Sequence, residues 1–216
     1  HPIPRRQRQM CIRDRDNIMF IIGLTGGVAS GKTTATNYFL NKGIEIIDAD
    51  EISRSLQIKG AEGYRKIIDK FGRKILNDDE SINRKILREL AFNDATNKKW
   101  LENLMHPMIQ KEVLTRLENV QSNWCVYSAP LWSAKHKFNR TLVIDAPEHI
   151  QLLRISERDG CTEEIARNII NNQISRQERK CFASDLIMND GSIAEFQKKL
   201  DFYYKLYSDL AHEQKN

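Results

Sequence analysis

Residues 19–34 read MFIIGLTGGVASGKTT, and this stretch decides the fold. Its first half, Met19 to Leu24, is a short and almost wholly apolar run, typical of a strand buried on both faces. Its second half, Gly26 to Thr33, matches G-x-x-x-x-G-K-[ST] at every fixed position. The stretch therefore predicts a strand, a glycine-rich loop and a helix in direct succession, which is the context that this motif requires.

Each residue type in this loop has a chemical reason. Glycines let the backbone curl so that successive N–H groups wrap an anion, and the helix that follows adds its positive N-terminal end. Lys32 can reach the β- and γ-phosphates of a nucleoside triphosphate, and the Thr33 hydroxyl can bind Mg²⁺. The alternative is a glycine-rich turn that binds nothing. The flanking strand and helix favour nucleotide binding, but they do not identify the phosphate acceptor.

The rest of the chain predicts strands that alternate with helices. Further strands are expected at 44–47, 124–127, 141–144 and 186–188. Helices are expected at 32–40, 148–158 and 162–177, and a last helix starts at Ser192, which has a capping-box partner in Glu195. This alternation predicts an α/β fold around a parallel sheet with right-handed crossovers.

A long helical insertion separates the second and third strands. Residues 61–120 are helical in character, with breaks expected near Gly72, Asp78-Asp79 and Pro107. The segment is too long for a simple connection, so we expect it to form a helical subdomain.

The composition is that of a globular protein. The chain has 216 residues, of which 40% are hydrophobic and 29% charged, so one or two domains are expected and disorder is not. No apolar run approaches the roughly 18 residues that span a bilayer, so we expect no membrane partner. The four cysteines are widely spaced without a CxxC pair. This spacing indicates neither a disulfide framework nor a zinc site and is typical of a reduced, cytoplasmic compartment.

The net charge of +5 raises the question of a nucleic-acid partner. Residues 1–18 carry five arginines and two aspartates, a local charge of +3, so the remaining chain carries only +2. An excess that small is typical of a solvated surface, and we expect no nucleic-acid binding. Residues 1–18 also lack the apolar segment of a signal peptide. We interpret them as an N-terminal extension outside the fold, which begins at Met19.

Two carboxylates follow the second predicted strand. Asp48 and Asp50 fall at the carboxyl edge of the sheet, where ligands of open α/β sheets bind. They could hold Mg²⁺ through water or take the proton of an attacking hydroxyl. Equally, Asp50 could cap a helix predicted to start at Glu51. The residues alone leave both interpretations open.

Five arginines gather between the fourth and fifth predicted strands. Such a cluster is typical of a mobile lid that brings guanidinium groups over transferring phosphates. A solvated helix face with intrahelical ion pairs is the alternative, and it fits any single arginine better than the lid does. We expect one or two of the five to act in a lid: Arg154, Arg158, Arg167, Arg176 and Arg179.

The chain closely resembles the dephospho-CoA kinases over nearly all of residues 19–210. The P-loop followed by Asp48-Ala49-Asp50 carries the resemblance, together with a His-Pro pair at His106 and the late N-x-G at Asn189. It extends to Phe71-Gly72, Ile82-Asn83-Arg84, Phe92, Leu104-Met105, Pro130-Leu131, Gln151 with Arg154, Gln173 and Asp185 to Gly191. Trp132 to Lys135 departs from the family pattern, and the segment around it is a few residues short.

The resemblance implies a fold and an activity. The fold is a three-layer P-loop kinase of the nucleoside-monophosphate-kinase type, with a five-stranded parallel sheet, a helical acceptor-binding insertion and a lid. The core is expected at 19–53 and 121–210, the insertion at 54–120 and the lid at about 155–183. The activity is ATP-dependent phosphorylation of the ribose 3′-hydroxyl of dephospho-CoA, the last step of coenzyme A synthesis. ATP is the co-substrate, with Mg²⁺, and we expect a monomer or weak homo-oligomer.

The resemblance also implies roles for single residues. Asp50 matches the proposed general base, and Lys32 and Arg154 are the other catalytic candidates. Asp48, Arg84 and His106 are acceptor-binding candidates, although His106 could instead mark a structural kink. Thr33 and Asp48 are the candidate Mg²⁺ contacts. The ATP-binding candidates are Gly27, Ala29, Ser30, Gly31, Lys32, Thr33, Thr34 and Asn189.

Two other functions remain open at this point. One is a kinase for a nucleoside monophosphate or a sugar. The other is a P-loop regulator that binds nucleotide and signals to a protein partner. Turnover of ATP with dephospho-CoA, but not with AMP, CMP or gluconate, distinguishes them.

Overall fold

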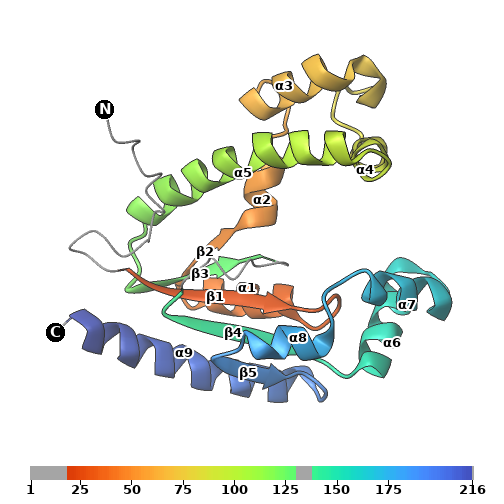
Figure 1. The fold of residues 1–216 in the computed structure, drawn as a ribbon. Helices are drawn as coiled ribbons and strands as arrows, with labels where there is room; N and C mark the ends of the chain where they lie inside the picture. The colour runs from red at the N-terminus through yellow and green to blue at the C-terminus, as the bar shows by residue number, and fades with distance from the viewer. Residues whose placement is uncertain (1–18, 130–137, 216) are drawn as a thin grey trace, which may run out of the picture. The chain divides into compact units, whose positions relative to one another are not determined.

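The structure is a computed structural model that describes residues 19–129 and 138–215 (Figure 1). The expectations for residues 1–18 and for Trp132 to Lys135 lie outside this range. The described chain forms two compact units. The P-loop unit comprises 19–45, 122–126 and 138–215, and the helical unit comprises 46–121 and 127–129.

Five parallel strands form one sheet in the order β2-β3-β1-β4-β5, which confirms the predicted five-stranded parallel sheet. The strands are β1 (Phe20–Gly26), β2 (Glu45–Asp48), β3 (Trp124–Ser128), β4 (Arg140–Asp145) and β5 (Asp185–Met188). Every residue of β1 is buried, as its apolar sequence predicts. In the register of the P-loop unit, Gly26 lies opposite Ile144 and Asp145 opposite Met188. The C-terminal ends of β1, where the P-loop starts, and of β4 therefore lie at the same edge of the sheet.

The helices of the P-loop unit are α1 (Lys32–Asn41), α6 (Glu148–Asp159), α7 (Glu163–Asn171), α8 (Arg176–Cys181) and α9 (Ile193–Lys215). The prediction of one helix over 162–177 is wrong, because the chain leaves the helix after Asn171 and starts α8 at Arg176. Ser175 caps α8 and forms a capping box with Glu178. The predicted capping box of Ser192 and Glu195 at the start of α9 is confirmed.

Aromatic residues fill the core of the P-loop unit. Trp124 of β3 packs edge-on against Phe39 of α1 and against Tyr207 of α9, with ring centroids 5.6 and 5.5 Å apart. All three side chains are fully buried. Burial of such large rings fixes both helices relative to the sheet and so holds the start of α1 in place.

The helical unit contains α2 (Ala49–Ser55), α3 (Glu62–Phe71), the 3₁₀ helix η1 (Arg73–Ile75), α4 (Arg84–Phe92) and α5 (Ala95–Glu118). Buried residues of α3, η1, α4, α5 and the segment before α4 share one apolar cluster. Its members are Tyr64, Ile67, Phe71, Ile75, Ile82, Leu87 and Met105.

The expected break at Gly72 is confirmed, since Gly72 ends α3 with a φ of +76°. The break expected at Pro107 is wrong, because α5 continues through this residue. A proline removes one helical hydrogen bond, but Asn103, whose carbonyl loses its partner, is exposed and open to water. Buried Met105 and Val113 hold the helix on either side. None of the helices in the described part of the chain is long and apolar enough to cross a membrane.

Candidate active site

The P-loop leads from β1 into the N-terminus of α1. The N–H of Ser30 donates to the carbonyl of Gly27 at 3.1 Å, which closes the turn. Gly31 is the N-cap of α1, and it offers no side chain to the first turn, which contains no acidic residue. The positive end of α1 is therefore left for an anion.

Two loop residues have left-handed backbone conformations, Ala29 with φ +54° and Gly31 with φ +106°. Alternating hand along a loop turns successive N–H groups to one side and makes an anion-binding concavity. For a residue with a Cβ this conformation costs roughly 1–2 kcal/mol. Ala29 is thus a strained residue that surrounding contacts must hold.

Side chains from later parts of the chain hydrogen-bond to the peptide groups of the loop. Gln151 and Gln173 hydrogen-bond to the two polar atoms of Val28, whose neighbours Gly27 and Ala29 continue the loop. The N–H of Val28 donates to Oε1 of Gln173 at 3.0 Å, and Nε2 of Gln151 donates to the Val28 carbonyl at 2.6 Å.

The predicted nucleotide contacts Arg154 and Asn189 also donate to loop carbonyls. Nη1 of Arg154 lies 3.3 Å from the carbonyl oxygen of Ala29. Nδ2 of buried Asn189 lies 2.8 Å from that of Ser30. The approach of Asn189 is so close that a Cβ on Gly31 would lie 2.4 Å from Nδ2, a second reason for glycine there. In the protein alone, both side chains support the loop.

The end of β4 carries an ion-pair cluster that sequence reasoning missed. Asp145 is 2% exposed and accepts two hydrogen bonds from Nε of Arg176, at 2.8 and 2.9 Å, while Lys180 lies 3.0 Å away. Burial works to raise the pKa of Asp145, but the bonds from Arg176 and Lys180 outweigh it and hold the pKa below its ordinary value. The cluster fastens α8 against β4 (Figure 1).

Arg179 is the most buried of the lid candidates. It is 5% exposed, its Nη2 donates to the carbonyl of Ile174 at 2.9 Å, and its Nε has no hydrogen-bond partner among the described residues. Burial lowers its pKa. A Cβ on Gly27 would lie 2.7 Å from Nη1, so glycine at this variable motif position gives Arg179 access to the loop.

The remaining two lid candidates form surface ion pairs. Arg158 pairs with its neighbour Asp159, and Arg167 pairs with Glu148 and Glu163 at 2.6 and 2.7 Å. All of these side chains are well exposed. The solvated-face interpretation fits Arg158 and Arg167, whereas Arg154, Arg176 and Arg179 lie at the loop or the strand end.

Asp48 and Asp50 have different structural roles in the helical unit. Asp48 is the N-cap of α2, and its Oδ1 accepts from the N–H groups of Asp50 and Glu51 at 2.9 and 3.0 Å. Its Oδ2 accepts from the Ser128 hydroxyl at 2.9 Å. The interpretation of Asp50 as the cap of a helix starting at Glu51 is therefore wrong, because α2 starts at Ala49 and Asp48 caps it.

Asp50 lies in the first turn of α2. Its carboxylate makes no hydrogen bond or ion pair with the residues that the structure describes, and it is half-buried. Burial, and then the charges of Asp48 and Asp50, raise the pKa of Tyr127 at the end of β3. A carboxylate with open lone pairs can accept a proton from a bound hydroxyl.

The acceptor-binding candidates of the insertion are both exposed. Arg84 begins α4, directly after the N-cap Asn83, and His106 lies in the middle of α5. Because α5 runs through Pro107, His106 lies within a continuous helix.

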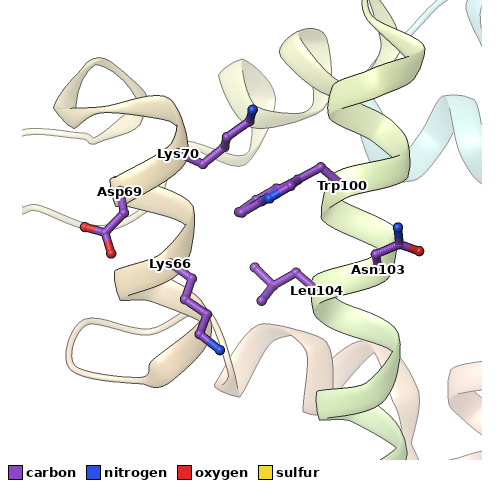
Figure 2. Close-up of a pocket in the computed structure, with 6 residues that line it drawn as sticks. All are labelled: Lys66, Asp69, Lys70, Trp100, Asn103 and Leu104. Carbon is purple, nitrogen blue, oxygen red and sulfur yellow. The ribbon is translucent and has the colours of Figure 1, made fainter.

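A shallow hollow of about 550 Å³ lies between α3 and α5 in the helical unit. Figure 2 shows Trp100 and Leu104 reaching from α5 toward α3. Trp100 packs edge-on against Phe71, and the Lys70 ammonium lies 5.9 Å from its ring centroid. Of the residues that the structure describes here, neither site candidate of the insertion lines the hollow, and its lining is explained by helix packing.

Metal ligands are sparse in the protein alone. No group of three or more His, Cys, Asp or Glu side chains within 19–129 and 138–215 could hold a metal ion. The hydroxyl of Thr33 is exposed and makes no hydrogen bond to the described residues, so it is open to a ligand. Such a site fits a cation that arrives with nucleotide phosphates and keeps several waters, as Mg²⁺ does.

The parallel sheet in this strand order, with a P-loop between β1 and α1, defines a P-loop kinase. The family model of dephospho-CoA kinase matches residues 20–195. The chain belongs to the dephospho-CoA kinase family.

Curated relatives and a solved structure support the same family assignment. The chain is 38% identical to the dephospho-CoA kinase of Idiomarina loihiensis over 191 residues, which are 87% of this chain and 95% of that protein. It is 40% identical to that of Buchnera aphidicola subsp. Schizaphis graminum over 189 residues, or 86% and 89% of the two chains. The solved dephospho-CoA kinase from Campylobacter jejuni is similar with a TM-score of 0.65 and 29% identity, over 88% of this chain and 97% of that one.

Proposed function

We propose that this chain transfers the γ-phosphate of ATP to the ribose 3′-hydroxyl of dephospho-CoA and so forms coenzyme A. Membership of the dephospho-CoA kinase family is the observation that carries this function. The reaction is an in-line phosphoryl transfer, in which positioning and charge stabilisation do most of the catalysis. We further propose a cytoplasmic location and a monomer or weak homo-oligomer.

The P-loop unit binds ATP in this proposal. The N–H groups of the loop and of the α1 N-terminus bind the phosphates, with Lys32 at the β- and γ-phosphates. Two left-handed residues in the loop and an α1 N-terminus without a side-chain cap support this role. Arg154 and Arg179 offset charge on the transferring group, since both lie at the loop. The contacting residues are Gly27, Ala29, Ser30, Gly31, Lys32, Thr33, Thr34 and Asn189.

Mg²⁺ accompanies ATP. When bound, it neutralises charge on the β- and γ-phosphates. The hydroxyl of Thr33 would hold it, and Asp48 would do so through water. The exposed hydroxyl of Thr33 and the acidic character of Asp48 fit a hard cation with oxygen ligands.

Asp50 is the proposed general base. It accepts the proton of the 3′-hydroxyl as that oxygen attacks the γ-phosphorus, and the ADP leaves with its β-phosphate oxygen. The finding that Asp48 caps α2 supports the proposal, because it leaves the Asp50 carboxylate without a structural task.

The insertion of residues 54–120 is the proposed acceptor-binding region. Arg84 and His106 offer exposed side chains that can bind the phosphates of dephospho-CoA. The lid is proposed at about 155–183, a segment that includes α7 and α8.

A coupled assay that follows ADP release tests the activity. We expect turnover with dephospho-CoA and none above background with AMP, CMP or gluconate. Release of ADP with AMP or gluconate at a similar rate would indicate another small-molecule kinase. Binding of ATP without turnover of any acceptor would instead indicate a nucleotide-dependent regulator.

A further inference from the structure

The N–H and the carbonyl of Val28, in the P-loop, both hydrogen-bond to side chains. The two side chains come from different elements: Gln151 from α6, and Gln173 from the turn between α7 and α8. Gln151 is 4% exposed, so its side chain is largely shielded from water. We call these two hydrogen bonds the Val28 bridge.

The partners fix the orientation of each amide. A backbone carbonyl can only accept, so Gln151 must present its NH₂ to Val28, and a backbone N–H can only donate, so Gln173 must present its oxygen. The bridge therefore has a defined polarity, with one donor and one acceptor that cannot be exchanged.

The bridge controls the direction of the next peptide group. In a trans peptide the carbonyl and the following N–H point to opposite sides. Because the Val28 carbonyl points to Gln151, the N–H of Ala29 points away from Gln151. Ala29 is also the strained residue of the loop, with a left-handed φ of +54°.

We propose that Gln151 and Gln173 are positioning residues for ATP, which act by holding Val28 so that the loop is shaped for phosphate before ATP arrives. The inference rests on the proposed ATP site and deepens it. Neither glutamine needs to touch the nucleotide. Glycine at position 27 fits this role, since a Cβ there would lie 2.6 Å from Nε2 of Gln151.

The polarity of the bridge gives a matched test with one chemical change at three sites. Gln151→Glu replaces the required donor by a carboxylate that faces a carbonyl oxygen, whereas Gln173→Glu keeps the required acceptor. Gln177→Glu adds the same charge at an exposed position of α8 and is the control. The affinity for MgATP is measured by calorimetry, and KM is measured for both substrates.

We expect Gln151→Glu to weaken MgATP binding about 10- to 100-fold, because the Val28 carbonyl loses its donor and faces a carboxylate instead. Gln173→Glu should stay within about threefold of Gln177→Glu, whereas Gln173→Met, which removes the acceptor, should weaken binding about 3- to 10-fold. The KM for dephospho-CoA should not change in any variant. If Gln151→Glu does not fold, Gln151→Met removes the donor without adding charge and should show the same direction.

Equal losses in Gln151→Glu and Gln173→Glu would overturn the proposal, since charge alone would then explain them. Unchanged MgATP affinity in Gln151→Met with a lowered melting temperature would also overturn it, because the glutamine would then be structural only. Failure of the unmodified chain to bind MgATP is a different result, and it would reject the proposed ATP site itself.

Discussion

The P-loop and the Asp48–Asp50 turn both follow a strand of the same parallel sheet, but they are held in different ways. The P-loop depends on side chains that lie far along the chain: Gln151 is 123 positions from Val28, and Asn189 is 159 positions from Ser30. The Asp48–Asp50 turn is held mainly by its own helix, because Asp48 caps α2 within three residues, and one bond from Ser128 is added to that cap.

In both segments, the groups that hold the backbone in place are different from the groups left open to a ligand. In the Asp48–Asp50 turn the support falls to one aspartate and leaves the other open. In the P-loop the support comes from outside, so the loop backbone itself stays open to phosphate. The comparison predicts that a substitution within the Asp48–Asp50 turn alters either catalysis or stability. A substitution of a residue that supports the P-loop alters the conformation of the loop and so the binding of ATP.

The largest effect is expected from Asp50→Asn. Loss of a positioned general base costs about 10²–10⁴-fold in kcat. Stability should change by less than about 1 kcal/mol, because only a favourable charge in the first turn of α2 is lost. Steady-state kinetics and urea unfolding test both expectations.

Asp48→Asn is the control for Asp50→Asn. An asparagine oxygen can still cap α2, and added Mg²⁺ should recover part of any lost activity in Asp48→Asn but none in Asp50→Asn. Near-parental turnover by Asp50→Asn, or loss of activity in Asp48→Asn alone, would refute the assignment of the base.

Lys32→Ala should lower kcat/KM by about 10²-fold or more, since a charge-assisted contact to the transferring phosphates is lost in a closed site. The fold should remain intact, which circular dichroism can check. Activity within a few-fold of the parent would mean that the loop does not bind the β- and γ-phosphates as proposed.

Asp145→Asn tests a support of the P-loop unit outside the loop. Arg176 and Lys180 lose their carboxylate, and we expect a loss of about 1–3 kcal/mol at neutral pH, measured by urea unfolding. The folded pKa of Asp145 lies below its ordinary value of about 4. Its ionisation therefore stabilises the fold above that pH, and the stabilisation is lost as the pH falls through the folded pKa.

The difference in stability between parent and Asp145→Asn should accordingly shrink from pH 7 toward pH 3. A difference that stays constant over this range would show that packing, and not charge, is responsible. A matched change at an exposed position, Asp190→Asn, should leave stability within about 0.5 kcal/mol at both values.

Asp48→Ala should cost about 1 kcal/mol of stability, the usual value of an N-cap, and Asp48→Asn clearly less. Thermal unfolding of the two variants measures the difference. If they are equally destabilised, the Ser128 contact and not the cap accounts for the role of Asp48 in the fold.

The features that the sequence predicts correctly are those set by residues close together in the chain. The apolar run of β1, the fixed positions of the P-loop and the capping box at Ser192 each lie within a few residues, and each was found in its predicted place. The break before α8 had a local signal as well, since Ser175 and Glu178 have capping-box spacing. A capping box needs only those two side chains, so it gives a weak signal in a segment rich in polar residues.

The remaining features depend on contacts between distant residues. Both aspartates of Asp48-Ala49-Asp50 suit an N-cap, so only the start of α2 could decide between them. The bonds of Gln151 and Gln173 to Val28 have no signature in either local sequence. A glycine at the variable motif position 27 was the single available hint that side chains approach the loop there.

The smallest effect is expected from Arg167→Ala. Arg167 is about half exposed, and its pairs with Glu148 and Glu163 lie on the surface, where such pairs contribute roughly 0–1 kcal/mol. We expect kcat/KM for ATP to stay within about twofold and stability within about 1 kcal/mol. Arg154→Ala is the matched comparison, because Arg154 donates to Ala29 in the P-loop, and there we expect a loss of about tenfold or more. Measurement of both variants under the same salt conditions separates loop-bound arginines from solvated ones. An equal loss of activity in the two variants would show that Arg167 leaves its surface pairs to act on the phosphates, and the assignment of lid arginines made from the protein alone would then be wrong.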